Sequence, residues 1–388
     1  MITICAVAGL ASAAAGARTV EAPRTGALAL SLGYARDIDA GRGGPRWISL
    51  SELAGSGPKA ITPVRPKRSR RADTDVALSP DGKRIAFFRR GPRAGLYVAN
   101  VDGSGLRRVA AGDAARLGPD GPPVWSPDGR QIAFALVGRS TCPLKTRGNP
   151  GIYVVRSRGG GVHKPPALTP RGRSWPNFIT VDAWSPDGRT LLYTELQFGG
   201  DCRGTDTSRV LELKIGGRRP SIVTDLGAWG YHARGVGWSA DGTIIAYREC
   251  YGDACDVVMR RGKEKWVVDP DYDDSNSPNL WGDIRWAPTG HKLASLARFE
   301  PAQSNAAGDL KLDVIDFDLK TVRALGVIRT NYDEAGLAWS SDARRIVVAV
   351  NSPVDVYSAG LGGSAPSRIG RVEFSKGVTY DSASLYVG

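Results

Sequence analysis

The sequence has few of the residues that most often carry catalysis. Among 388 residues it has three His, five Cys and two Met, and it has no Gly-x-Ser-x-Gly motif. A serine hydrolase needs a nucleophile beside a histidine base, and most transition-metal sites need clustered His or Cys ligands. The sequence therefore gives little support to either kind of enzyme.

Long hydrophobic runs are also missing, apart from one short stretch at the start. Residues 1–17 carry no charge, are apolar from Ile2 to Leu10, and end in the small residues Ala15-Gly16-Ala17. This pattern is typical of a signal peptide and is too short to span a bilayer. We expect cleavage near Ala17, an extracytoplasmic location (periplasm, cell envelope or secreted) and no transmembrane segment.

The composition favours strands over helices. The chain has 49 Gly and 25 Pro, with 41% hydrophobic and 23% charged residues. So many turn-forming residues suit many short strands joined by turns, so we predict an all-β protein.

Basic residues outnumber acidic ones, and the formal net charge is +13. Such a charge attracts anionic surfaces at long range, but no nucleic-acid-binding motif accompanies it. We expect a solvated basic surface and no specific nucleic acid. The run PVRPKRSRRA, at residues 63–72, favours a solvated loop over an anion-binding patch.

One motif recurs along the chain at intervals of 47 to 59 residues. The copies are LSPDGKRIAFF from Leu78, WSPDGRQIAFA from Trp125, WSPDGRTLLYT from Trp184, WSADGTIIAYR from Trp238, WAPTGHKLASL from Trp286 and WSSDARRIVVA from Trp339. Ser-Pro-Asp-Gly forms a tight turn, because Pro presets φ, Asp binds the local backbone and Gly accepts positive φ. Further β-rich runs follow each turn, so each unit is predicted to be a four-stranded blade.

These repeats resemble the TolB-like propeller repeat, a relative of the WD repeat. It occurs in TolB of the Tol-Pal system and in the propeller halves of prolyl-oligopeptidase-type enzymes. The resemblance covers Asp75 to Gly388. It implies a ring of blades whose first strands line a central channel. Thr289 and Ala343 replace the turn Asp and Gly, so those two turns should differ in detail.

The ends of the chain are predicted to share a closing blade, because closure removes exposed sheet edges. Strand-like runs are 28–32, 47–50 and 59–62 near the N-terminus, with 372–375 and 384–387 near the C-terminus. We expect one propeller domain over 18–388, with a composite blade from 26–62 and 371–388. Its six repeats start near residues 75, 122, 181, 235, 283 and 336. This predicts seven blades, with six as the alternative.

Four cysteines remain after the leader. They fall in equivalent loops of three successive repeats, and so on one face of the ring. An even number in an exported chain favours disulfides. We predict one bridge between Cys142 and Cys202 and another between Cys250 and Cys255. A four-cysteine zinc site is disfavoured because the spacings lack paired Cys-x-x-Cys.

The repeated Trp residues end first strands, which predicts a core role for them. Other side chains lie in loops that enter the innermost strands, where aromatic faces could stack on a ligand. The candidate ligand-binding residues are Trp175, Phe178, Trp229, Tyr231, His232, Trp281, Tyr332 and Asp333. The alternative is that these side chains anchor their loops to the core.

The remaining candidates for chemistry are weak. Asp269, Asp271 and Asp273 alternate as calcium ligands do, but the loop lacks the EF-hand Gly and Glu and also fits an acidic turn. His163, His232 and His291 are predicted to lie in separate loops, with His232 in a loop between blades. We assign no catalytic residue and expect no cofactor, calcium being the one candidate.

The leading functional hypothesis is a monomeric, noncatalytic, extracytoplasmic module that presents one loop face to a protein or a cell-envelope glycan. The alternative is a propeller enzyme, a glycan hydrolase or lyase acting at the channel mouth. A third hypothesis is a propeller separated from a peptidase partner.

Overall fold

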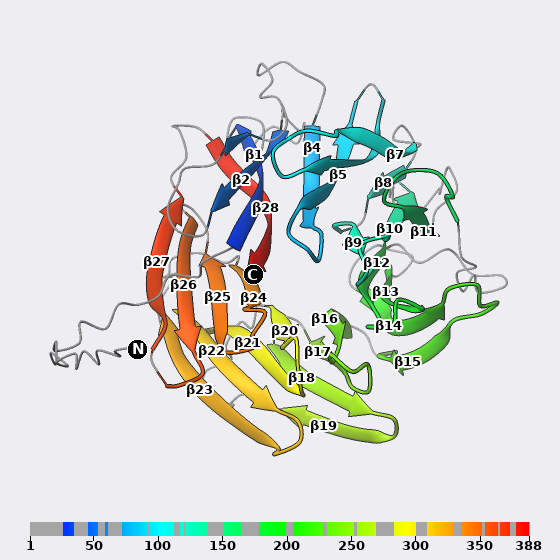
Figure 1. Ribbon diagram of the computed structural model, residues 1–388. Helices are drawn as coiled ribbons and strands as arrows, with labels where there is room; N and C mark the ends of the chain where they lie inside the picture. Colours follow the sequence, from blue (N-terminus) through cyan, green and yellow to red (C-terminus); the bar gives the residue numbers. More distant parts are fainter. Residues whose placement is uncertain are drawn as a thin grey trace, which may run out of the picture.

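The computed structural model is a ring of antiparallel sheets (Figure 1). It describes residues 26–34, 46–52, 59–60, 72–91, 93–111, 117–119, 121–138, 151–163, 178–198, 205–227, 231–251, 254–268, 283–299, 309–329, 335–350, 354–363, 365–372 and 378–387. The elements within these ranges are strands, as the composition predicts.

The described strands form six sheets, which we name A to F in chain order. Sheet A contains β28 (Val378–Val387), β1 (Gly26–Tyr34), β2 (Arg46–Glu52), β3 (Lys59–Ala60), β4 (Ala72–Leu78), β5 (Arg84–Arg90), β6 (Gly95–Asn100) and β7 (Arg107–Ala111). Blade B contains β8 (Leu117–Pro119), β9 (Val124–Trp125), β10 (Gln131–Gly138) and β11 (Gly151–Arg156).

The other four blades are regular four-stranded meanders. Blade C contains β12 (Phe178–Trp184), β13 (Thr190–Phe198), β14 (Thr205–Lys214) and β15 (Ser221–Asp225). Blade D contains β16 (Tyr231–Trp238), β17 (Ile245–Tyr251), β18 (Ala254–Arg261) and β19 (Glu264–Val268). Blade E contains β20 (Ile284–Trp286), β21 (Lys292–Phe299), β22 (Asp309–Asp316) and β23 (Thr321–Ile328). Blade F contains β24 (Ala335–Trp339), β25 (Arg345–Val350), β26 (Val354–Gly360) and β27 (Ser367–Val372).

The two ends of the chain close the ring together. β1 pairs with β28 in antiparallel register, from Gly26 opposite Val387 to Tyr34 opposite Val378. Seven separate blades are not supported, because the closing strands do not form a sheet of their own. A parallel pairing of Arg46 with Ala72 joins β2 to β4, so the closing strands and the first repeat share the eight-stranded sheet A.

The C-terminal strand assignment also needs correction. Val372 ends the outer strand of blade F, and a single strand, β28, covers the run predicted at 384–387. The sequence pattern failed here because Val372 is buried between blade F and the closing strands, and an apolar residue at that point resembles the start of a strand.

The repeated turns are built as predicted. In the first copy the hydroxyl of Ser79 donates to Asp81 Oδ1 at 2.5 Å, and the backbone N–H of Gly82 donates to the Ser79 carbonyl. The prediction of a different turn at Ala343 is wrong. Ala343 adopts φ 57°, and its N–H donates to the Ser340 carbonyl at 2.9 Å, so the hydrogen bonds hold an alanine in a glycine-like conformation.

The repeated Trp side chains connect neighbouring sheets. Trp125, Trp184 and Trp339 are buried, and their indole N–H groups donate to backbone carbonyls of the preceding sheet, in β4, β9 and β20 respectively. Trp286 makes the same bond to the Gly237 carbonyl at 3.0 Å. Because a buried indole N–H needs an acceptor, these four bonds fix the strands that carry the Trp residues against the neighbouring sheet. The indole N–H of Trp238 is the exception, since it is buried and has no hydrogen-bond partner among the described residues.

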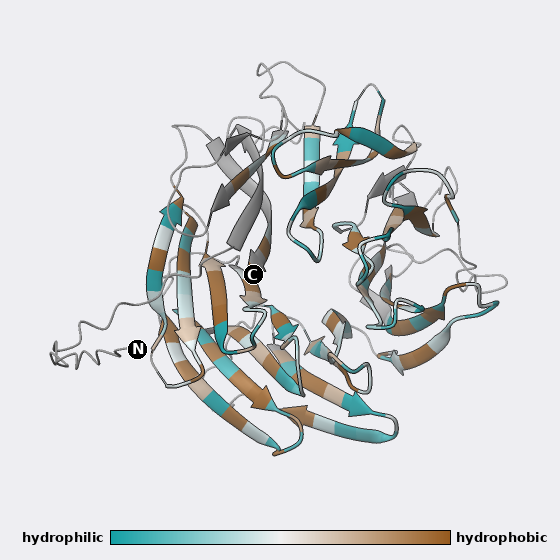
Figure 2. Ribbon diagram, viewed as in Figure 1, coloured by the Kyte–Doolittle hydropathy of each residue, from teal (hydrophilic) through white to brown (hydrophobic). Residues whose placement is uncertain are grey.

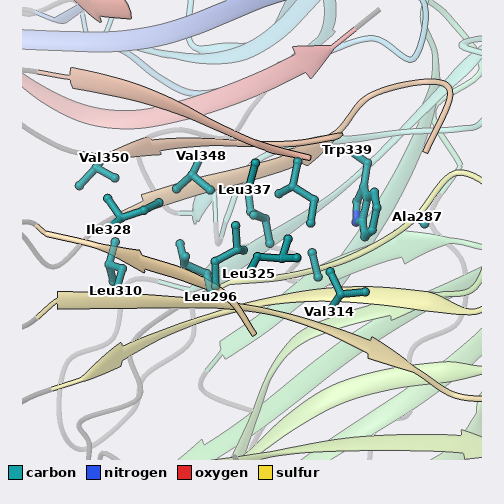
Figure 3. Close-up of a cluster of buried hydrophobic side chains, with 14 residues drawn as sticks. Ala287, Leu296, Leu310, Val314, Leu325, Ile328, Leu337, Trp339, Val348 and Val350 are labelled. Carbon is teal, nitrogen blue, oxygen red and sulfur yellow. The ribbon is translucent and has the colours of Figure 1, made fainter. Parts of the chain in front are cut away.

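The interface between blades E and F is a continuous apolar core. Figure 3 shows side chains of β24 and β25, such as Leu337 and Trp339, facing side chains of blade E, such as Leu296 and Val314. Figure 2 shows hydrophobic residues along β22 and β25 and hydrophilic residues at the turn between β18 and β19. Successive residues of a strand point to opposite faces of the blade, so each blade packs apolar side chains against both of its neighbours, and this packing holds the ring together.

Candidate functional site

Two of the predicted ligand-binding side chains, Tyr231 and His232, are among those that the structure describes. They begin β16, the innermost strand of blade D, so His232 lies in a strand rather than in a loop between blades. Phe178 begins β12, which is the innermost strand of blade C. The other five lie outside the described residues: Trp175, Trp229, Trp281, Tyr332 and Asp333.

Tyr231 belongs to an aromatic pair at the rim of blade D. Its ring centroid lies 4.9 Å from that of Tyr251, which ends β17 and is 60% exposed. The register pairs Tyr231 with Tyr251 and His232 with Cys250. Sequence reasoning missed Tyr251, although its place directly after a loop cysteine could have indicated a rim position.

The predicted disulfide between Cys250 and Cys255 is present. It links the facing ends of β17 and β18, with the two Cα atoms 3.9 Å apart. Both cysteines are buried and pack with Ala297 of blade E. The bridge thus closes the β17–β18 hairpin at the rim of blade D, where it packs against blade E. Cys142 and Cys202 lie outside the described residues, so their bridge stays a prediction.

A buried arginine lies between blades D and E. Arg248, in β17, is 2% exposed and donates to the Ser295 hydroxyl at 3.2 Å and to the Leu296 carbonyl at 2.5 Å, both in β21. Arg234 stands directly opposite Arg248 in the β16–β17 register. At the start of the innermost strand of blade E, Arg285 forms an ion pair with Asp283 at 3.1 Å.

The charges of this group influence one another. Burial lowers the pKa of Arg248 to about 10; Asp283 opposes that shift, and the like charge of Arg234 adds to it. Burial raises the pKa of Asp283, while Arg285 and Arg248 act to lower it. Arg248 therefore stays charged at neutral pH within a mainly cationic group.

A buried carboxyl lies between blades B and C. Glu195, in β13, is 6% exposed, and no described group hydrogen-bonds to its Oε1. Burial raises the pKa of Glu195 to about 7, although Arg209 and Tyr193 act to lower it. Glu195 could therefore exchange a proton near neutral pH. The same strand position, eleven residues after the repeat's anchor, is apolar in blades B, E and F but is Glu249 in blade D and Arg89 in sheet A, so the charge in the sequence did not single out Glu195.

His291 lies at the opposite face of the ring, in the turn before β21, and it is not isolated. Its Nδ1 is 2.7 Å from Asp318 Oδ2, its Nε2 is 3.0 Å from Asp241 Oδ2, and Arg261 contacts both His291 and Asp318. The hydrogen bonds to Asp241 and Asp318 raise the pKa of His291. Hydrogen bonds and ion pairs of this cluster therefore connect the turns of blade D to those of blade E.

Within the described ranges, no group of three or more His, Cys, Asp or Glu side chains could hold a metal ion. Asp269, Asp271 and Asp273 lie outside those ranges, so the calcium candidate stays a prediction. The same part of the chain contains no helix long and apolar enough to cross a membrane.

No protein-family model matches the sequence. Among curated proteins, dipeptidyl-peptidase 5 of Trichophyton equinum is 33% identical over 137 residues, which is 31% of this chain and 17% of that protein. Dipeptidyl-peptidase 5 of Arthroderma benhamiae matches the same share of the chain at 32% identity. The chain thus matches about a sixth of the length of these relatives.

Several solved structures have similar folds. A puromycin hydrolase has a TM-score of 0.61 and 15% identity, over 92% of this chain and 53% of that chain. An oligogalacturonate lyase in complex with manganese has a TM-score of 0.57 and 15% identity, over 82% of this chain and 83% of that chain.

The proteins named by the sequence resemblance are also similar. A prolyl endopeptidase has a TM-score of 0.53 and 16% identity, over 89% of this chain and 47% of that chain. TolB of Acinetobacter baumannii has a TM-score of 0.49 and 16% identity, over 93% of this chain and 66% of that chain. The propeller fold with four-stranded blades, which the resemblance implies, is confirmed.

These comparisons contradict the leading hypothesis of a noncatalytic binding module. The curated relatives are named as dipeptidyl-peptidases, and the similar structures include a hydrolase, an endopeptidase and a lyase. The expectation that the protein is not an enzyme is wrong for the same reason. The residues that repeat along the strands are conserved between blades because they pack the fold. A fold can host many activities, so the small number of catalytic residue types in the repeats does not exclude an enzyme.

Proposed function

We propose that this chain is the propeller of a peptidase that releases short fragments, such as dipeptides, from the ends of peptides. The observation that carries the proposal is the 33% identity to dipeptidyl-peptidase 5 over 137 residues. The fold shared with a puromycin hydrolase over 92% of this chain supports it. In this proposal the ring admits and orients the substrate.

The proposal places the nucleophile outside these 388 residues, because the sequence has no Gly-x-Ser-x-Gly motif. It also places the protein outside the cytoplasm. The Cys250–Cys255 disulfide supports that location, since disulfides persist in oxidising compartments.

The second candidate is a glycan lyase that acts from the propeller itself. The observation that favours it is coverage, because the similarity to the oligogalacturonate lyase extends over 82% of this chain and 83% of that one.

The test uses the natural gene product that contains this sequence. Dipeptidyl-coumarin amides are assayed with and without a fluorophosphonate inhibitor, and oligogalacturonides are assayed in parallel by the ultraviolet absorbance of an unsaturated product. Coumarin release that the inhibitor blocks supports the peptidase. Uronide cleavage without coumarin release favours the lyase, and inactivity on both overturns both proposals.

A further inference from the structure

We infer that the turns at one face of blades B and C form a surface that docks on an anionic phospholipid bilayer. The surface consists of exposed basic side chains in four turns, with exposed apolar side chains beside them. We name it the BC turn surface, and its basic residues are Arg130, Arg156, Arg158, Arg189, Lys214, Arg218 and Arg219. The inference goes beyond the proposed function and applies to a peptidase and to a lyase alike.

The four turns lie on one face of the ring. In blade B, β10 leads away from the turn that contains Arg130, and the antiparallel β11 returns to the same face. The N–H of Ser157, directly after β11, donates to the Arg130 carbonyl at 2.8 Å. Blade C is built in the same way, because the N–H of Ile215 donates to the Arg189 carbonyl at 2.8 Å. In each blade the two turns are therefore side by side.

The turns of the two blades are also neighbours. Gly188, in the first turn of blade C, lies beside Pro127 in the first turn of blade B. The indole N–H of Trp184 donates to the Val124 carbonyl, and Figure 1 shows the two blades next to each other in the ring. The basic residues therefore belong to one surface that extends over both blades.

Cations outnumber carboxylates on this surface. Within the described ranges, no ion pair is formed by Arg156, Arg158, Arg218 or Arg219. The other three cations each lie near one carboxylate: Arg130 near Asp128, Arg189 near Asp187, and Lys214 near the half-buried Glu212. The two exposed carboxylates among these also accept hydrogen bonds from the hydroxyl and N–H groups of their own turns. The surface therefore has an excess of positive charge.

The same face of blades D and E is neutralised instead. Its ion pairs are Arg261–Asp318, Lys292–Asp316 and Lys320–Glu264, with N–O distances of 2.9, 2.7 and 2.7 Å. The repeated turns thus accommodate paired charges, and the fold does not require the excess of cations on blades B and C. A cationic surface of this kind attracts an anionic partner at long range.

Exposed apolar side chains lie beside the cations. Val162 follows the second turn of blade B and is 53% exposed, and Ile222, in β15 of blade C, is 54% exposed. Cations alone are enough to bind a soluble polyanion. A bilayer surface binds cations through its headgroups and apolar side chains at the boundary with the acyl chains. The combination of the two kinds of side chain favours a bilayer as the partner.

The type of cation fits the headgroup. All of the basic residues of the BC turn surface except Lys214 are arginines. A guanidinium is planar and donates two parallel hydrogen bonds, which match two oxygens of a phosphate. The BC turn surface is therefore suited to the phosphates of anionic phospholipids.

The experiment measures how the natural gene product that contains this sequence sediments with vesicles. One kind of vesicle is phosphatidylcholine alone, and the other is equal parts phosphatidylcholine and phosphatidylglycerol. We expect binding to the mixed vesicles only, and weaker binding at high salt. Arg156→Gln/Arg158→Gln and Arg218→Gln/Arg219→Gln should each weaken this binding by more than about tenfold, because each arginine near an anionic membrane contributes about fivefold. Val162→Ser should weaken it by about threefold, because an apolar contact is lost.

Arg90→Gln/Arg329→Gln is the matched control, because it removes the same charge from the opposite face: Arg90 ends β5 and Arg329 follows β23, and both are exposed. The control should bind mixed vesicles as the wild type does. Melting temperatures close to that of the wild type show that each variant is folded.

Equal binding of the wild type to both kinds of vesicle overturns the inference, as does an equal loss in the control and in the two turn variants. Binding to polygalacturonate that depends on the same arginines, without binding to vesicles, overturns the bilayer as the partner. The vesicle assay needs no turnover, so its failure is distinguishable from a failure of the proposed function.

Discussion

Two neighbouring interfaces of the ring differ in how they are built. The E–F interface is an apolar cluster of buried residues that includes Leu296, Leu312 and Trp339. The D–E interface combines an apolar cluster around Phe317 with charged groups on either side of it. Its charged parts are the His291 cluster at the turns and the Arg248 group, with the Cys250–Cys255 bridge near the rim.

The difference extends to equivalent positions of neighbouring blades. The position that is Leu296 in blade E is Arg248 in blade D, each ten residues after its anchor Trp. The same strand geometry therefore accommodates a packing residue in one blade and a buried cation in the next. The E–F interface is therefore held by apolar packing, whereas the D–E interface also buries charged groups.

The largest expected effect comes from breaking the E–F interface. Trp339→Ala should lower the free energy of unfolding by about 4 kcal/mol, because it leaves a large cavity and removes a hydrogen bond to the Arg285 carbonyl. The half-buried Trp286 of the D–E interface is the matched control, and Trp286→Ala should cost about half as much. Chemical denaturation measures both, and equal losses would contradict the proposed difference.

The next effect compares one substitution at equivalent positions. Arg248→Met should cost about 3 kcal/mol, because it removes the donor to Ser295 and Leu296 and leaves Asp283 with less compensating charge. Leu296→Met should cost less than about 1.5 kcal/mol, because volume and polarity are nearly kept. Urea denaturation of the two variants gives the comparison, and a smaller loss for Arg248→Met would refute it.

A third prediction concerns the B–C interface. The pKa of Glu195 is about 7 in the fold, whereas 4.5 is the ordinary value. Between these pH values the unfolded chain has lost a proton that the folded chain keeps, so stability falls as pH rises towards 7. Glu195→Gln should therefore be more stable than wild type by up to about 3 kcal/mol at pH 8, with little difference near pH 4. Denaturation at both pH values tests this, and a pH-independent difference would rule it out.

The fourth prediction concerns the rim. Replacing both Cys250 and Cys255 by Ala should lower the free energy of unfolding by about 2 kcal/mol, because the bridge closes a short loop. Thermal unfolding of the variant without reductant measures the loss. A variant as stable as wild type would show that the hairpin pairing of β17 with β18 is sufficient there.

The smallest effect is expected at the His291 cluster, because Asp241 and Asp318 are about half exposed. The pKa of His291 is raised above 6.5 by these carboxylates. The stabilisation is therefore fully present below pH 6.5 and is lost as pH rises through the higher pKa of the folded state. His291→Gln should lower the melting temperature at pH 6 and have less effect at pH 9. His163→Gln is the control, and an equal loss at both pH values would argue against the charge-based contact.

The turns and the core could be predicted from local sequence. Ser79 and Asp81 lie two residues apart, so their hydrogen bond depends on a few adjacent dihedral angles. The repeated Trp residues were assigned to the core by their fixed place after the first strand. Tyr251, Arg248 and Glu195 could not be assigned to a site in this way, because their environment depends on strands of the same or the next blade.

By itself, the sequence determined the repeated unit, its turns, the strand alternation and the Cys250–Cys255 bridge, because each depends on residues close together in the chain. Only the tertiary structure decided that the closing strands join the first repeat, that Arg248 lies between two blades, and that His291 meets Asp241 of the preceding repeat. These contacts join residues that are far apart in the sequence, and the closure of the ring brings them together.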